Sequence, residues 1–319
     1  MITDIILIII GVAMVLAGAD RLTEGASALA RRMKVSEIII GLTIVAAGTS
    51  APELFVSLMS ALNGTPDLAV GNVVGSNTMN CMLIVGCAAM VAPMTISRST
   101  VRKDIPFSVG ASILLIITAA DAFMGRFDGI ILLVGFAIFM TYTIMQALGH
   151  NGNAAEQLST DDGHPGSRLS QSLWLNIAYV LLGLLMLIFG SDMFVSSASS
   201  VAAQLGVSEG VIGLTVVAGG TSLPELATSV VAARKGQSAI AIGNVIGSNV
   251  FNILMILGLT ATISPLEIEG ITTIDMAVML LSVALVWLFS YTRFTVERWE
   301  GAVLVGGYLV YLFWLINNL

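Results

Sequence analysis

The stretch AAGTSAPELF, residues 46–55, places the carboxylate of Glu53 beside a proline in the middle of a long apolar run. A second stretch, AGGTSLPELA at residues 218–227, repeats this pattern around Glu225. A carboxylate in an apolar environment is unfavourable unless it finds a partner. The repetition therefore indicates a specific role for a pair of acids that the chain carries deep inside apolar segments.

The rest of the composition is that of a membrane protein. Of 319 residues, 56% are hydrophobic and only 10% are charged, whereas soluble domains carry about 25% charged residues. Apolar runs of about 20 residues are long enough to cross the hydrocarbon core as helices, and a β-barrel would instead show alternating segments of about ten residues. We predict an all-α membrane protein with ten transmembrane helices, at residues 4–20, 38–62, 69–92, 105–122, 129–148, 173–190, 210–233, 239–264, 274–292 and 301–317.

The basic residues predict the orientation of the chain. Cytoplasmic loops carry an excess of Lys and Arg, and with ten spans the odd-numbered loops hold twelve of the 13 basic residues. We therefore expect a multi-pass protein of the cell (inner) membrane with both termini outside. The polar stretch 149–172, which contains His150 and His164, is expected to be a cytoplasmic linker between residues 1–148 and residues 173–319.

The two halves repeat one another at a constant spacing. Glu53 and Glu225 are 172 residues apart, and Asn80 and Asn252 have the same separation. Each unit contains five predicted spans, so the second copy enters the membrane from the opposite face, and the basic residues are redistributed between corresponding loops accordingly. We predict two inverted-topology repeats of five helices, an architecture typical of transporters that bind their substrate near the bilayer midplane.

The proline of GTSAPE is expected to break the helix beside the first acid. Pro52 has no N–H and its ring crowds the preceding turn, so backbone carbonyl groups around residues 46–48 become available. Thr49 and Ser50 lie four and three residues before Glu53, which brings two hydroxyl groups beside the carboxylate. Oxygen ligands of this kind suit Na⁺ or Ca²⁺ and not Zn²⁺ or Cu⁺. The second copy supplies the same set with Thr221, Ser222 and Glu225.

A second motif, GNVVGSNTMN at residues 71–80, recurs as GNVIGSNVFN at residues 243–252. Its glycines allow helix backbones to approach closely. Asn80 and Asn252 fall near the centre of the bilayer, at the depth of the two acids. We therefore assign to the same site the polar residues Ser76, Asn80, Ser248 and Asn252, and we assign to packing or capping the remaining asparagines Asn72, Asn77, Asn244 and Asn249.

Each motif also has a purely structural explanation. Ser50 and Glu53 match a helix capping box, and the polar groups of the second motif could simply join helices by hydrogen bonds. The depth of the acids favours an ion site, because a carboxylate at the bilayer centre costs about 3 kcal/mol and a cap contributes only about 1 kcal/mol. A cation between the two acids removes this penalty together with their mutual repulsion.

With GTSAPELF…GNVVGSNTMN and GTSLPELA…GNVIGSNVFN, the chain resembles the sodium/calcium exchanger family of the cation/calcium antiporter superfamily over nearly its full length. The resemblance implies an ion-binding core formed by spans two, three, seven and eight, across which spans one and six slide. It also implies ligands of three kinds, namely the carboxylates of Glu53 and Glu225, the hydroxyl groups of Thr49, Ser50, Ser76, Thr221, Ser222 and Ser248, and the carbonyl groups of Ala46 and Ala218. Asn80 and Asn252 would lie at the centre, where the family commonly has an aspartate in place of Asn252, so this chain is left with two carboxylates instead of three.

These features lead to the hypothesis of secondary active antiport, in which Na⁺ and Ca²⁺ exclude one another from shared oxygen ligands. The alternative is a Ca²⁺/H⁺ antiporter in which protons neutralise the same acids. An enzyme is not expected, because a hydrolase needs a nucleophile with a base or a metal with an open position, and the predicted spans contain no His. The expected partners are inorganic cations, as transported substrates, and membrane lipid. We expect no cofactor and no nucleic acid, and the sequence, which is compatible with a monomer, indicates no oligomer.

Overall fold

The computed structural model describes residues 1–149, 172–206 and 218–317, and this part of the chain is almost entirely helical. Seven of its helices are long and apolar enough to cross a membrane, and a bent pair, Glu37–Thr49 with Ala51–Leu62, makes an eighth span. The predicted class, an all-α membrane protein, is confirmed to this extent. The predicted linker, with both histidines, lies outside the described residues except at its two ends.

Two of the ten predicted spans are not among these eight for identifiable reasons. The predicted helix at 105–122 is present as α7 (Ile105–Thr118), which has only 14 residues and follows the π-helix η3 (Thr100–Asp104). The predicted span 210–233 begins outside the described residues, which resume at 218.

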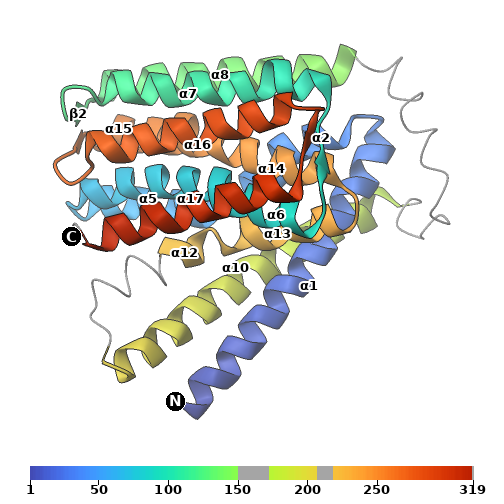
Figure 1. The fold of residues 1–319 in the computed structure, drawn as a ribbon, viewed down its shortest axis with the longest axis horizontal. Helices are drawn as coiled ribbons and strands as arrows, with labels where there is room; N and C mark the ends of the chain where they lie inside the picture. The colour runs from blue at the N-terminus through green and yellow to red at the C-terminus, as the bar shows by residue number, and fades with distance from the viewer. Residues whose placement is uncertain (150–171, 207–217, 318–319) are drawn as a thin grey trace.

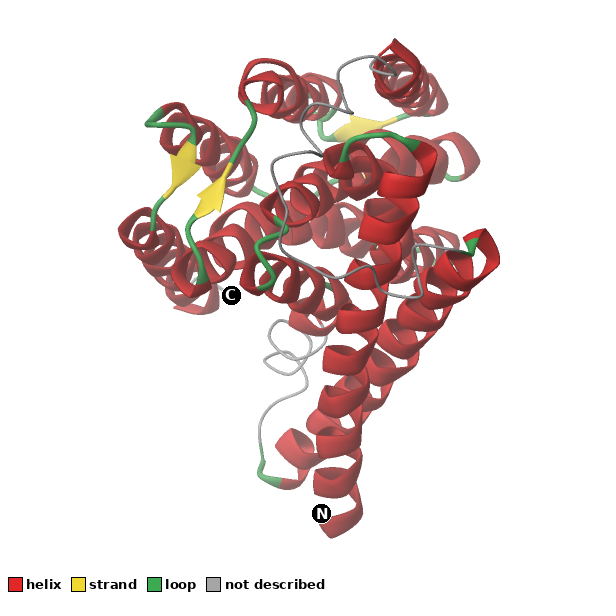
Figure 2. Ribbon diagram, turned by 90° about the vertical axis from the view of Figure 1, so that its right-hand side faces the viewer, coloured by secondary structure: helices red, strands yellow, loops and turns green. Residues whose placement is uncertain are grey.

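Two 32-residue helices, α1 (Ile2–Met33) and α10 (Leu173–Gln204), pack against each other and project together beyond the rest of the bundle (Figures 1 and 2). They are longer than the predicted spans because the helices continue through polar residues. Glycines line their crossing: a Cβ on Gly183 would lie 2.6 Å from the backbone nitrogen of Leu22, and one on Gly18 would lie 2.9 Å from the Gly183 carbonyl oxygen. Only glycine permits this approach of the two backbones.

The first acid-bearing segment is a broken helix, as the proline predicts. It starts with α2 (Glu37–Ile40), continues as the π-helix η1 (Gly41–Val45) and α3 (Ala46–Thr49), and bends by 46° into α4 (Ala51–Leu62). Pro52 lies in the first turn of α4, where its missing N–H is tolerated. The second copy is broken at the equivalent place, between α12 (Ala218–Thr221) and α13 (Leu223–Arg234).

The second motif lies on the two most deeply buried spans. One consists of α5 (Pro66–Met79), η2 (Asn80–Ile84) and α6 (Val85–Val91), and the other of α14 (Ser238–Val250), η7 (Phe251–Leu257) and α15 (Gly258–Ile263). Both change from α-helix to π-helix at the last asparagine of the motif or one residue before it. Such π segments inside helices occur frequently at functional sites.

The remaining helices pack around this core, and short strand pairs tie the loops together. The helices are α7, α8 (Arg126–Gly149), α16 (Thr273–Tyr291) and α17 (Arg298–Asn317). Each two-stranded ribbon in Figure 2 joins the two halves of the sequence: β1 (Met94–Thr95) pairs with β4 (Thr295–Val296), and β2 (Phe123–Met124) pairs with β3 (Leu266–Glu267).

Candidate ion-binding site

The structure brings the two acids of the repeated motif into one hydrogen-bonded cluster. Glu53 and Glu225 are each only 1% exposed and lie in the first turns of α4 and α13. Ser222 donates a hydrogen bond of 3.1 Å to Oε1 of Glu53, and Ser50 donates one of 3.2 Å to Oε1 of Glu225. Each acid therefore accepts a hydrogen bond from a serine of the other half, the one that lies three residues before the acid of that half.

Three of the other hydroxyl residues of the candidate set, Ser76, Ser248 and Thr49, contact the same cluster. The hydroxyl oxygen of Ser222 also lies 3.2 Å from that of Ser76, within hydrogen-bond distance, and Ser248 lies 3.5 Å from Oε1 of Glu225. Thr49 donates to the side-chain oxygen of Asn244 at 3.0 Å. Thr221 is the last residue of α12, directly before Ser222.

The backbone at the helix break differs from the expectation in one respect. The carbonyl oxygen of Ala46 is not released by the proline, because the Ser50 amide donates to it at 3.0 Å and α3 continues to Thr49. The Thr49 hydroxyl group also lies 3.4 Å from this oxygen, so the Ala46 carbonyl has two donors within reach. Ala218, its counterpart, is the first residue of α12.

Four buried oxygens of the cluster accept no hydrogen bond. They are one carboxylate oxygen of each acid and the side-chain oxygens of the two central asparagines, namely Oε2 of Glu53, Oε2 of Glu225, Oδ1 of Asn80 and Oδ1 of Asn252. Buried acceptors of this kind are uncommon and unfavourable. Both halves contribute the same two atom types, so the cluster presents a symmetric set of oxygens suited to a hard cation.

Two further asparagines hold the central pair in place. The amide nitrogen of Asn80 donates to Oδ1 of Asn249 at 3.0 Å, and that of Asn252 donates to Oδ1 of Asn77 at 3.1 Å. These bonds occupy the nitrogen ends of Asn80 and Asn252 and leave their oxygen ends unpartnered. The sequence pattern predicts packing or capping roles for Asn77 and Asn249. Their position three residues before the central asparagines, on the same helical face, is the signal that could have revealed this orienting contact.

A third pair of asparagines fastens the acid-bearing helices to the neighbouring spans, as expected for packing groups. Asn72 donates to the Glu53 carbonyl at 3.2 Å and to Ser57 at 2.9 Å. Asn244 makes the equivalent bonds, at 3.3 Å to the Glu225 carbonyl and 3.0 Å to Ser229. The two halves thus support their acids with the same contacts.

No basic side chain neutralises the two acids in the described part of the chain. Its ion pairs are formed by the terminal amine, Arg21 and Lys235, which pair with Asp4, Asp20 and Glu24. Nor do these residues contain a group of three or more His, Cys, Asp or Glu side chains that could hold a metal. The cluster is therefore an oxygen site of two carboxylates and neutral groups.

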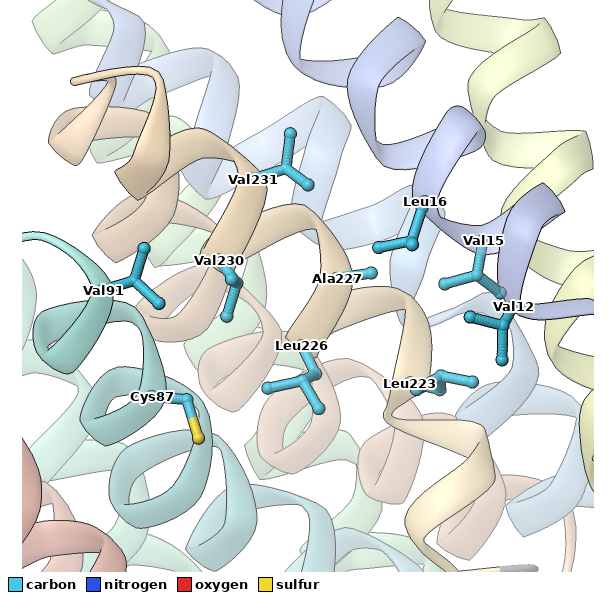
Figure 3. Close-up of a pocket in the computed structure, with 10 residues that line it drawn as sticks. All are labelled: Val12, Val15, Leu16, Cys87, Val91, Leu223, Leu226, Ala227, Val230 and Val231. Atoms are coloured by element: carbon cyan, nitrogen blue, oxygen red, sulfur yellow. The ribbon is translucent and has the colours of Figure 1, made fainter. Parts of the chain in front are cut away.

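A separate cavity of about 320 Å³ lies between α1, α6 and α13, and neither acid lines it (Figure 3). Its walls are apolar, so it lacks the oxygen ligands that a cation requires. The candidate ion site is thus defined by the buried oxygens and not by this cavity.

Comparison with known proteins identifies the class. The family described as "Sodium/calcium exchanger protein" matches residues 3–145 and again residues 175–317. The chain therefore belongs to the sodium/calcium exchanger family of membrane transporters. The relatives that it resembles include proteins named as exchangers and antiporters, and the predicted family resemblance is confirmed.

Individual relatives cover the whole chain. The inner membrane protein YrbG of Escherichia coli (strain K12) is 38% identical over 97% of this chain and 96% of its own. The sodium/calcium exchanger MaX1 of Methanosarcina acetivorans is 33% identical over 97% of both. A solved structure of the sodium-calcium exchanger NCX_Mj, soaked with 2.5 mM Na⁺ and 0.1 mM Ca²⁺, matches with a TM-score of 0.83 at 28% identity and covers 97% of both chains.

Proposed function

We propose that this protein is a secondary active antiporter that exchanges Na⁺ for Ca²⁺ at a site between Glu53 and Glu225. The observation that carries the proposal is the pair of buried acids, joined across the two halves, each with one carboxylate oxygen that accepts no hydrogen bond. Two uncompensated carboxylates in a dry interior are strongly unfavourable. Bound cations would relieve both their burial and their repulsion.

The proposed ligands are oxygen atoms of three kinds. Ca²⁺ takes six to eight oxygen ligands in flexible geometry, and the cluster supplies this number only if both carboxylates take part. The full proposed set is Glu53, Glu225, Thr49, Ser50, Ser76, Thr221, Ser222, Ser248, Asn80 and Asn252, with the carbonyl groups of Ala46 and Ala218. Since Asn252 is neutral, the site carries two negative charges, which one Ca²⁺ balances.

The exchange would proceed by alternating access. We propose ten spans in two inverted repeats, residues 1–148 and 173–319, with residues 149–172 as a cytoplasmic linker and both termini outside. The two segments that match the exchanger family begin 172 residues apart, at 3 and 175, which supports the repeat. The glycine-lined pair of α1 and α10 would slide across the core only when ions neutralise the acids, because an empty dianionic site is unfavourable at low dielectric.

A Ca²⁺/H⁺ antiporter is the second candidate. The site contains two carboxylates and no third acid, and two protons would neutralise it as completely as one Ca²⁺ does. The choice between Na⁺ and H⁺ therefore depends on which ion drives Ca²⁺ movement.

The test is Ca²⁺ uptake into vesicles reconstituted with the purified protein. Radioactive Ca²⁺ should accumulate when an outward Na⁺ gradient is imposed and should not accumulate with Na⁺ equal on both sides. Uptake driven by a pH gradient alone would instead establish the proton-coupled candidate. Failure of both gradients to drive uptake, in vesicles that contain folded protein, would disprove the proposed antiport.

A further inference from the structure

The apolar cavity has walls from three helices that meet beside the ion-binding core. On α13 the lining residues repeat every three or four positions and form one stripe along the helix, with Leu223 at its start and Val231 at its end. The complete lining, shown in Figure 3, consists of Val12, Val15 and Leu16 of α1, Cys87 and Val91 of α6, and Leu223, Leu226, Ala227, Val230 and Val231 of α13.

The cavity opens to the outside of the helix bundle. Three of its lining side chains are well exposed, with exposed fractions of 38% for Val12, 52% for Leu16 and 44% for Val91. All three lie in predicted membrane spans, where the surrounding medium is hydrocarbon. Its volume of about 320 Å³ is within the range of small-molecule pockets. Since the walls offer no polar partner, the part of a ligand that fits here is an apolar chain.

One arginine follows the lining residues at the end of α13, and another contacts the lining residue at the end of α6. Arg234 is the last residue of α13 and continues the lining stripe, four residues after Val230 and three after Val231. Arg298 donates a hydrogen bond of 3.5 Å to the carbonyl oxygen of Val91, at the end of α6. Both arginines are exposed. Neither forms an ion pair with any acid in the part of the chain that the structure describes.

We propose that this cavity binds an acyl chain of an anionic phospholipid whose phosphate group lies at Arg234 and Arg298. An apolar cleft at hydrocarbon depth with unpaired guanidinium groups at one end matches both parts of such a lipid, because guanidinium binds phosphate with paired hydrogen bonds. On the proposed topology this end faces the cytoplasm, where anionic lipids attract basic side chains. A lipid seated here would touch α1 and also α13, which carries Glu225.

The other half of the chain does not repeat this surface. The positions 172 residues earlier hold Phe55 in place of Ala227 and Leu62 in place of Arg234. Arg126 is the counterpart of Arg298, but the counterpart of Arg234 is not basic, so the other half has one of the two arginines only. The lipid site belongs to one half, and the other half supplies matched control variants.

Native mass spectrometry of the intact protein tests the site. Protein is taken from vesicles of equal phosphatidylglycerol and phosphatidylcholine, and the retained lipids are counted. We expect preferential retention of one phosphatidylglycerol, a roughly tenfold lower retention in Ala227→Phe and in the double variant Arg234→Gln/Arg298→Gln, and no change in Arg126→Gln. Unchanged retention in Ala227→Phe or in the double variant would overturn the proposal, and so would equal retention of the two lipids.

Photocrosslinking of the unmodified protein covers the case in which Ala227→Phe does not fold. Phosphatidylglycerol with a photoreactive group in its acyl chain should label peptides containing Cys87 and residues 223–231 above all others. Labelling spread evenly over the exposed faces of α8 and α17 would instead show ordinary surrounding lipid and overturn the site. Neither experiment depends on transport, so the result stands apart from the antiport proposal.

Discussion

The two halves of the molecule hold their acids with the same contacts, but their acid-bearing helices, α4 and α13, pack differently against the long helices α1 and α10. Asn72 and Asn244 make equivalent bonds to the segments that carry Glu53 and Glu225. In contrast, α1 packs along α13, whereas α10 contacts α3, α12 and α13 without comparable packing along α4. The ion-binding core is thus symmetric, and the contact between this core and the helix pair is not.

One ion pair marks this asymmetry. Lys235, at the end of α13, contacts Oδ1 of Asp20 on α1 at 2.5 Å and also donates to Thr23 at 3.2 Å. The corresponding residues of the other half are Asn63 and Asp192, of which only one is charged. The ion pair therefore joins α1 to α13 in one half only, and a repeated core can be given unequal sides by a few substitutions.

The symmetry of the core predicts equal and large effects for its two acids. Glu53→Gln and Glu225→Gln should each reduce ion-driven Ca²⁺ uptake at least about 100-fold, because a single remaining carboxylate leaves bound Ca²⁺ with an uncompensated positive charge in a low-dielectric site. Uptake into reconstituted vesicles measures this effect. Asp192→Asn, which removes an exposed acid, serves as the control and should retain activity. Normal uptake by either glutamine variant would show that the two halves do not share one site.

A smaller effect is expected at the asparagines behind the ligands. Asn77→Leu and Asn249→Leu each remove the acceptor that orients Asn252 or Asn80, and we expect a roughly 10- to 100-fold higher KM for Ca²⁺, as for partners of metal ligands in general. The two variants should behave alike because the two bonds have similar lengths, 3.1 Å and 3.0 Å.

Cys81→Ala is the matched control for this pair. The Cys81 thiol accepts a hydrogen bond from Asn249 at 2.9 Å. Within the part of the chain that the structure describes, it makes no hydrogen bond to the side chain of Asn80 or Asn252, so it does not orient either of the central asparagines. Its substitution should leave KM nearly unchanged. If Asn77→Leu and Asn249→Leu lower the yield of folded protein but the folded fraction has the normal KM for Ca²⁺, then Asn77 and Asn249 act only in packing.

Substitutions at the crossing of α1 and α10 are expected to change the stability of the protein. Gly183→Val adds a branched side chain at a position where even a Cβ would lie 2.6 Å from the Leu22 nitrogen, so α1 and α10 must separate. Overpacking of this kind typically costs about 1–3 kcal/mol, which should lower the melting temperature of the detergent-solubilised protein. Gly306→Ala in α17, where a Cβ meets nothing within 4 Å, is the control and should melt normally. Equal melting temperatures for both variants would contradict the close crossing.

Several of these features could be predicted from the sequence, and others could not. The fold class follows from long apolar runs, and the meeting of Glu53 with Glu225 follows from the repeat. The hydrogen bond to the Ala46 carbonyl persists because Pro52 removes only the bond to the carbonyl four residues earlier, that of Gly48, so the expected release extended too far back along the helix. The π segments η2 and η7 are likewise a product of packing around Asn80 and Asn252.

The particular partner of Asp20 could not be predicted for a different reason. Asp20 near the end of the first predicted span is expected to face water or pair with a loop base, and the structure shows that its base comes from a residue more than 200 positions later in the chain. Pairing partners at such separation follow from the way the helices assemble. The cavity between α1, α6 and α13 could not be predicted either, because it forms only where the three helices meet.

The smallest expected effect concerns this ion pair, and it tests the asymmetry directly. Lys235→Met should loosen α1 from α13 and raise the hydrogen-exchange rate of α1 peptides that face α13 by about 1.4- to fivefold, the range expected for a partly exposed pair worth about 0.2–1 kcal/mol. Arg21→Gln is the matched control, since Arg21 pairs within α1 and stacks on Tyr179 of α10, so it does not join α1 to the core. If both variants raise exchange equally, the ion pair does not hold α1 against α13, and the difference between the halves must come from apolar packing along α13 alone.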